Sequence, residues 1–203
     1  MPLIKICGLK RIEDINAANE FKPDYVGFVF AESKRQVSCH QATYLANSLK
    51  PSIKKVGVFV NRPIDEVREI AMRCNLDVLQ FHGEESPDYC NSFSQEVWKS
   101  IRVKDENSLN GLDDYQVSGI LLDAFHKDLY GGSGESFDWN LVKNYKGNKK
   151  LIIAGGLDIN NIIDCIDSTQ PDIIDVSSGV ETNGYKDYLK IGELIRKVRY
   201  TYG

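Results

Sequence analysis

The chain has 203 residues, of which 42% are hydrophobic, and its formal net charge is -4. This length and composition suit one folded domain with a real core, so we expect a single domain over residues 1–203. The mildly acidic balance argues against a nucleic-acid partner, which would need a basic face, and no apolar stretch approaches the ~20 residues that span a membrane.

Short runs rich in Val, Ile, Leu and Phe alternate along the chain with segments of helical periodicity. This alternation predicts parallel βαβ units with strands buried on both faces. The expected strands are Leu3–Cys7, Tyr25–Phe30, Lys55–Val60, Val78–His82, Val97–Val103, Gly119–Asp123, Leu151–Ala154 and Ile173–Ser177. The expected helices are Ile12–Phe21, one opened by Pro63, one opened by Ser86-Pro87, one from an Asp158 N-cap to about Ile166, and Tyr188–Val198.

Eight such units in so short a chain predict an α/β fold, a single-domain (β/α)8 TIM barrel. An open doubly wound sheet is the alternative, and its phosphate-binding glycines would follow the first strand as G-x-G-x-x-G. Here Gly8 stands alone after the first strand, whereas other glycines cluster late in the chain. This distribution favours the closed barrel.

The last two strands end abruptly at small residues, which expose backbone N–H groups to an anion. In barrels of this kind, the loops after strands seven and eight often form a phosphate site. The residues concerned are Gly155, Gly156, Ser177, Ser178 and Gly179. We therefore expect a phosphorylated small molecule as the ligand.

Polar residues also occupy strand ends, where a barrel interior is normally apolar. Because alternate residues share a face of a strand, the aliphatic pair Ile4 and Ile6 would turn Lys5 and Cys7 inward. Asp123 ends the sixth strand. On the same grounds, Gln80 and His82 share one face of the fourth strand, and Asp175 and Ser177 share one face of the eighth. Convergence at one barrel mouth indicates a site.

Each of these residues also has a structural interpretation. A free cysteine usually behaves as a small buried hydrophobe, Asp123 could cap the following loop, and His82 suits a hydrogen-bonded structural role better than that of a base. Lys5 could pair with Asp175 or could lower the pKa of Cys7, and the sequence leaves both open. Two further histidines are expected in loops, and three scattered histidines predict no metal site. These two are His40 and His126.

Two loops allow similar alternatives. Arg35 follows the second strand and could be solvated, or could bind the carboxylate of a ligand through two parallel hydrogen bonds; its position at the catalytic end favours the second. The glycines of Gly131–Gly134 could form a flexible turn or a lid over the ligand. The five cysteines form neither a C-x-x-C motif nor a disulfide framework, and the N-terminus lacks a signal-peptide core, so a cytoplasmic location is expected.

The chain resembles the phosphoribosylanthranilate isomerase family of tryptophan biosynthesis, over nearly its whole length. The matching segments are Lys5–Gly8, Gly27–Phe30, Ser33–Arg35, Val56–Phe59, Leu79–Gly83, Leu121–Asp123, Gly131–Trp139, Ala154–Leu157 and Asp175–Glu181. Lys34 departs from the pattern, because the family commonly has Pro there. His126 is not expected to be a family feature.

The resemblance implies roles for several residues. Cys7 would be the general base, Asp123 the general acid and Arg35 the contact to the anthranilate carboxylate, with the small residues after strands seven and eight holding phosphate. The implied reaction is an Amadori rearrangement of N-(5-phosphoribosyl)anthranilate that needs no cofactor. The site should then lower the pKa of Cys7 and keep Asp123 in its acid form.

Three other functions fit these residues less well. A pentose-phosphate epimerase would need metal-binding His and Asp residues at several strand ends, and only His82 qualifies. An indole-forming synthase would need more catalytic Lys and Glu residues at strand ends. A catalytically silent barrel that binds a phospho-ligand or a protein would not need Cys7 and Asp123 intact. A monomer is expected, because no long exposed apolar stripe stands out.

Overall fold

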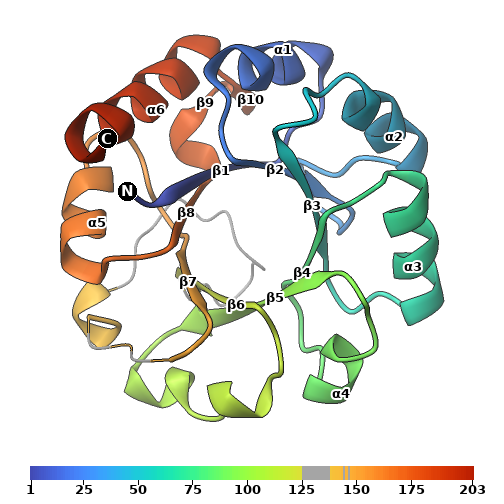
Figure 1. The fold of residues 1–203 in the computed structure, drawn as a ribbon, viewed down its shortest axis with the longest axis vertical. Coiled ribbons are helices and arrows are strands. Elements are labelled where there is room, and N and C mark those ends of the chain that lie inside the picture. The colour runs from blue at the N-terminus through green and yellow to red at the C-terminus, as the bar shows by residue number, and fades with distance from the viewer. Residues whose placement is uncertain (125–137, 144, 146) are drawn as a thin grey trace.

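The computed structural model describes residues 1–124, 138–143, 145 and 147–203. Eight parallel strands pair in chain order, and the eighth pairs with the first to close a barrel, with helices around it (Figure 1). The strands are β1 Leu3–Cys7, β2 Tyr25–Val29, β3 Lys54–Phe59, β4 Val78–Phe81, β5 Glu96–Val103, β6 Gly119–Ala124, β7 Lys150–Ile153 and β8 Ile173–Val176. The predicted (β/α)8 barrel is confirmed, and no strand end differs from its predicted position by more than one residue.

Within the described residues, six α-helices lie on the outside of the barrel. They are α1 Ile12–Phe21, α2 Cys39–Asn47, α3 Ile64–Arg73, α4 Pro87–Cys90, α5 Ile162–Thr169 and α6 Tyr188–Tyr202. Helix α1 has its predicted bounds, Pro63 is the N-cap of α3, and the Ser86 side chain caps the single turn of α4. Helix α6 runs four residues beyond its predicted end. Among the described residues, no helix is long and apolar enough to cross a membrane.

The predicted start of α5 was wrong. Asp158 Oδ1 accepts hydrogen bonds from the backbone N–H groups of Asn160 and Asn161, at 2.7 and 3.3 Å. Its side chain therefore closes a turn ahead of the helix, and α5 begins only at Ile162. An Asp side chain can stabilise either a turn or a helix start, which is why composition alone placed the boundary too early.

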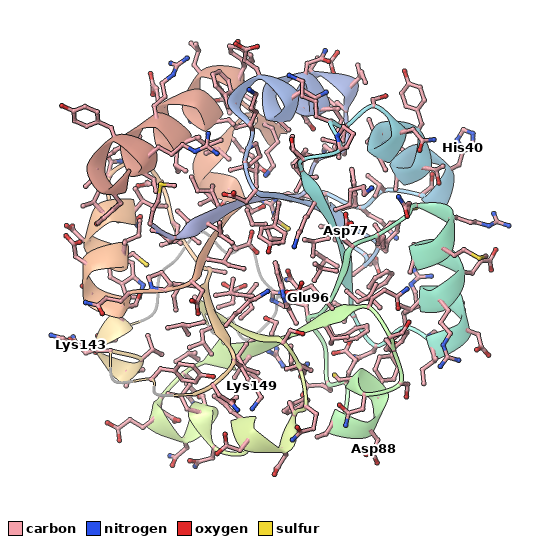
Figure 2. All side chains as sticks on the ribbon, in the orientation of Figure 1. His40, Asp77, Asp88, Glu96, Lys143 and Lys149 are labelled. Atoms are coloured by element: carbon pink, nitrogen blue, oxygen red, sulfur yellow. The ribbon has the colours of Figure 1, made fainter. Side chains whose placement is uncertain are left out.

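Helix α2 was not predicted, and His40 lies in it rather than in a loop. Ser38 Oγ accepts from the N–H of Gln41, which is the Ser-x-x-Gln spacing of a helix start. The His40 side chain is exposed on the outer side of the barrel (Figure 2). His126 and the segment Gly131–Gly134 lie outside the described residues.

The connections after the later strands contain short 3-10 helices and one hairpin. The 3-10 helices are η1 Glu106–Leu109, η2 Leu112–Asp114, η3 Trp139–Leu141 and η4 Ser178–Val180. After η4, β9 (Glu181–Thr182) pairs antiparallel with β10 (Tyr185–Lys186). Figure 1 places this hairpin beside α1 and α6, close to β1.

The apolar core has two parts. The larger cluster fills the space between strands and helices, and a smaller one fills the barrel interior. The members of the smaller cluster are Tyr25, Val56, Val78, Trp98, Leu121, Ile152, Ala154 and Ile173. Trp98 is fully buried and packs edge-on against Tyr25, with 5.0 Å between ring centroids. Because the interior is packed with side chains, the polar residues gather at the carboxyl ends of the strands.

Candidate active site

A buried ion pair joins the first and last strands of the barrel. Lys5 Nζ lies 2.6 Å from Asp175 Oδ2, and Lys5 is completely buried. The two residues are register partners on β1 and β8. A lone charge would be costly at this depth, so the pairing removes a large desolvation penalty. Lys5 is oriented inward as expected. Of the two interactions that the sequence left open, the structure shows the ion pair with Asp175, and the charge of Lys5 also acts to lower the pKa of Cys7.

Cys7 lies at the end of β1, two residues beyond Lys5, and is buried. Gly27 on β2 makes room for its thiol, because a Cβ at that position would come 2.7 Å from Cys7 Sγ. Burial raises the pKa of Cys7, the charges of Lys5 and Lys186 lower it, and Asp175 raises it. The net shift is upward, so the expected lowering was wrong: desolvation of the thiolate outweighs the two nearby cations.

Asp123 lies on β6 and is buried with 4% of its surface exposed. Its Oδ1 accepts a hydrogen bond from the backbone N–H of Ala124 at 2.8 Å, and its Oδ2 lies 3.2 Å from His82 Nε2. Gly155, which has φ +86°, passes so close that a Cβ there would come 2.8 Å from Asp123 Oδ1. The loop after β7 is therefore in direct contact with the Asp123 carboxyl group.

Gln80 and His82 are both buried and contact each other. Gln80 Nε2 lies 3.0 Å from His82 Nδ1. An amide nitrogen can only donate, so in this assignment His82 Nδ1 accepts, and a neutral ring carries its proton on Nε2, which faces Asp123. Three buried polar atoms at the barrel mouth lack hydrogen-bond partners among the described residues, a pattern that suits a polar ligand. They are Gln80 Oε1, His82 Nε2 and Asp175 Oδ1.

Arg35 is buried and paired with Glu181, which sequence analysis did not identify. Its Nε and Nη2 donate to the two carboxylate oxygens of Glu181 at 2.7 and 3.0 Å. The side chain lies against Gly8, which has φ +85° and where a Cβ would come 2.5 Å from Arg35 Cδ. Neither of the two alternatives weighed for Arg35 included an internal carboxylate partner. The guanidinium is nevertheless held beside the residue that follows Cys7.

Glu181 and Lys186 are cross-strand partners in the β9–β10 hairpin. The turn residues Asn183 and Gly184 both have positive φ, 54° and 77°, as a type I′ turn requires. Lys186 Nζ donates to Glu181 Oε1 at 2.7 Å and to the backbone oxygen of Ser177 at 2.9 Å. The Asn-Gly pair is a hairpin signal that was present in the sequence and could have revealed this element.

The loops after β7 and β8 contact each other at the carboxyl end of the barrel. Gly155 and Gly156 both have positive φ, and a Cβ on Gly179 would come 2.0 Å from the Leu157 backbone oxygen. Ser177 Oγ donates to the backbone oxygen of Cys7 at 3.1 Å, so the loop after β8 is also bonded to the end of β1. The small residues predicted to hold phosphate are thus brought together; all are half-buried, namely Gly155, Gly156, Ser177, Ser178 and Gly179.

The described part of the chain contains no group of three or more His, Cys, Asp or Glu side chains that could hold a metal ion. The charged groups at the mouth form one ion pair and one triplet instead. Lys5 pairs with Asp175, and Glu181 is shared between Arg35 and Lys186.

Comparison with known proteins places these features in a family. The family model for N-(5'phosphoribosyl)anthranilate (PRA) isomerase matches residues 4–197. N-(5'-phosphoribosyl)anthranilate isomerase of Thermoanaerobacter sp. (strain X514) is 50% identical over 200 residues, with 98% of each chain covered. The corresponding protein of Caldanaerobacter subterraneus subsp. tengcongensis is 48% identical, also with 98% of each chain covered.

Solved structures give the same result. The phosphoribosyl anthranilate isomerase of Thermotoga maritima aligns with a TM-score of 0.90 at 33% identity, covering 98% of this chain and all of that one. A complex of phosphoribosyl anthranilate isomerase with reduced 1-(o-carboxyphenylamino)-1-deoxyribulose 5-phosphate has a TM-score of 0.86, the same identity and the same coverage. A further T. maritima structure, described as monomers generated from a dimeric form, has a TM-score of 0.88 at 35% identity and again the same coverage.

The Glu181 triplet predicts a specific pH dependence of stability. Burial alone would raise the pKa of Glu181, but the hydrogen bond from Arg35 and the charge of Lys186 outweigh it and lower the pKa to about 2. A carboxylate with a depressed folded-state pKa stabilises the protein above its unfolded value, near 4.5, and loses this contribution as the pH falls toward about 2. Urea unfolding between these pH values should show a steeper loss of stability in the wild type than in Glu181→Gln. Parallel pH curves for the two proteins would contradict the assignment.

Proposed function

The chain belongs to the N-(5'-phosphoribosyl)anthranilate isomerase family, and we propose that Cys7 and Asp123 carry out the acid and base steps of its reaction. The protein is an isomerase that converts N-(5-phosphoribosyl)anthranilate to 1-(2-carboxyphenylamino)-1-deoxyribulose 5-phosphate in tryptophan biosynthesis. The observation that carries the residue assignment is the placement of a buried thiol and a buried carboxyl group at the carboxyl ends of β1 and β6.

The first step would belong to Asp123. In its acid form it would protonate the furanose ring oxygen, and the ring would open to a protonated imine at C1. Two features of the site support this role. The carboxyl group is buried at the barrel mouth, and among the described residues only its Oδ1 accepts a backbone hydrogen bond. His82 Nε2 lies 3.2 Å from the other oxygen, Oδ2, without a hydrogen bond to it in this structure, and a proton on Nε2 would stabilise the carboxylate left after proton transfer.

The second step would belong to Cys7. The protonated imine acidifies the proton on C2, and the Cys7 thiolate would remove it to give an enolamine, which tautomerises to the product. The substrate nitrogen accepts the electrons of the broken C–H bond, so the rearrangement needs no further electron sink. Burial raises the pKa of Cys7 overall, and the charge of Lys5 is the largest effect that opposes this rise and favours the thiolate. Acid–base steps of this kind contribute about 10²–10⁴-fold each.

The substrate also carries two anionic groups that would fix its orientation. The carboxylate of the anthranilate would bind the Arg35 guanidinium beside Gly8. The phosphate would bind the main-chain N–H groups of the loops after β7 and β8, where glycines leave the backbone accessible. Within this site, Gln80 and His82 would contact the ribose hydroxyls, since both carry buried atoms without partners among the described residues.

Removing either acid–base group should cost turnover rather than affinity. We expect Cys7→Ser and Asp123→Asn each to lower kcat by about a hundredfold or more with little change in KM, because their work is done in the transition state. The measurement is the loss of anthranilate fluorescence on conversion of the substrate. Near-wild-type turnover in one of these variants would remove that residue from the mechanism. A wild type no faster than the uncatalysed reaction would leave the silent-barrel alternative.

Arg35→Ala should act mainly on substrate binding. The carboxylate contact is present in the ground state and persists through the reaction, so KM should rise at least tenfold while kcat changes much less. Arg35→Lys should recover only part of the affinity, because an ammonium cannot make two parallel hydrogen bonds. Arg73→Ala on the exposed face of α3 is the control and should behave as the wild type. A collapsed kcat with an unchanged KM in Arg35→Ala would contradict this role.

We further propose that the protein is a monomer, although a T. maritima relative is described as dimeric. The large apolar side chains that are exposed among the described residues are spread over five parts of the chain: Met1 and Leu3 at the N-terminus, Tyr44 on α2, Met72 on α3, Tyr185 on β10, and Tyr188, Leu189 and Tyr200 on α6. Scattered apolar side chains of this kind do not form an interface. Sedimentation equilibrium should return the mass of one chain, 22.9 kDa, and twice that mass would contradict the proposal.

A cytoplasmic location is also proposed. All five cysteines are free thiols, including Cys39 and Cys74, whose sulfur atoms lie 3.9 Å apart without a bond. Thiols this close are kept reduced most readily in the cytoplasm. Fractionation of the source cells should recover the protein and its activity together with cytoplasmic markers, and recovery outside the cell would contradict this proposal.

A further inference from the structure

We propose that the β9–β10 hairpin is a working part of the active site, in which Lys186 stabilises the thiolate of Cys7 and Glu181 orients Arg35 for the substrate carboxylate. This inference rests on the proposed function, which assigns the roles of Cys7 and Arg35. Both hairpin residues are positioning residues, since they act through another side chain. The hairpin comprises residues 181–186 and follows η4.

Lys186 is a fixed charge rather than a mobile surface lysine. Its side chain is 1% exposed. The ammonium group donates to Glu181 Oε1 at 2.7 Å, to the Ser177 backbone oxygen at 2.9 Å and to Ser177 Oγ at 3.3 Å. Ser177 Oγ in turn donates to the backbone oxygen of Cys7 at 3.1 Å. This chain of contacts fixes the cation relative to the end of β1.

The charges near Cys7 are not balanced in the same way on both sides. Below the thiol, the charge of Lys5 is neutralised by one carboxylate, Asp175, whose Oδ2 lies 2.6 Å from Lys5 Nζ. On the hairpin side, one carboxylate, Glu181, serves two cations, Arg35 and Lys186. Among the described groups that act on the thiol, the surplus positive charge therefore comes from the hairpin cluster, and a positive surplus favours a thiolate.

Glu181 keeps this cluster in its working state. Burial lowers the pKa of Lys186 overall, and the charge and hydrogen bond of Glu181 oppose that lowering, so the Glu181 contact favours the ammonium form. Glu181 binds Arg35 through Nε and one N–H of Nη2. A guanidinium has five donors in one plane, so this contact fixes the orientation of the plane and leaves the N–H groups of Nη1 and the second N–H of Nη2 for a second carboxylate.

The decisive test follows Cys7 itself and needs no substrate. The rate of Cys7 alkylation by iodoacetamide, measured by peptide mass spectrometry over a pH series, reports the thiolate fraction. Lys186→Gln and Lys186→Met both remove the charge, and we expect roughly tenfold slower alkylation of Cys7 at a given pH below the midpoint, with the midpoint moved upward. Lys186→Arg should restore the wild-type midpoint because it keeps the charge.

The matched control is Lys190→Met. Lys190 Nζ donates to the backbone oxygen of Glu181 at 2.8 Å, so the variant removes the same charge and another contact to the same hairpin, but from an exposed position. Its alkylation profile should be that of the wild type. A folded neutral Lys186 variant with an unshifted Cys7 midpoint would overturn the inference, as would a Lys186→Arg profile that matches the neutral variants.

Turnover then separates this inference from the proposed function. In Lys186→Gln, kcat at neutral pH should fall about tenfold with little change in KM, and should recover as the pH is raised. In Glu181→Gln, KM should rise several-fold more than kcat falls, because Arg35 loses its orientation. A shifted alkylation profile in a protein without isomerase activity would refute the proposed function and leave the charge effect of Lys186 intact. Normal isomerase activity with unshifted alkylation would refute the hairpin role alone.

Discussion

The structure depends on one buried ion pair, between Lys5 and Asp175. It joins β1 to β8, the two strands whose pairing closes the barrel, and it lies directly beneath Cys7. Replacing such a pair with apolar side chains often costs a protein nothing, so a buried ion pair is weak evidence of a stabilising role. Its position below the thiol gives it a different use: it brings a cation to the end of β1 without leaving either charge unpaired.

Burial and nearby positive charges have opposite effects on the pKa of the Cys7 thiol. Burial raises the pKa of Cys7 more than the cations lower it, so the balance lies on the side of the neutral thiol. That balance is adjustable, because each cation is held by a carboxylate and a small change in pairing changes the charge felt at sulfur. Asp123 lies on β6, where its carboxyl group contacts His82 and Gly155. The two reactive groups therefore occupy separate local environments in one mouth.

The strands and the inward-facing polar residues could be predicted because both follow from local pattern. Apolar runs mark strands buried on two faces, and the alternation along β1 placed Lys5 and Cys7 inside. What local pattern could not supply was pairing across the barrel. Glu181 is 146 residues from Arg35 in sequence, and the Asn-Gly turn that brings Glu181 opposite Lys186 carries no catalytic signal of its own. The sign of the Cys7 pKa shift was wrong for the same reason, since burial depends on the whole fold.

The shared carboxylate also explains how the mouth could accept an anionic ligand. A ligand carboxylate on Arg35 adds a negative charge beside a thiol that must itself become negative, and like charges at this distance would oppose the thiolate. Because Glu181 is paired with both Arg35 and Lys186, these three side chains carry a net charge of +1 before the ligand binds. The ligand carboxylate would neutralise this positive charge and would not make the cluster negative. Lys5 and Lys186 would still lower the pKa of Cys7. Binding and deprotonation can then occur in the same pocket without opposing each other.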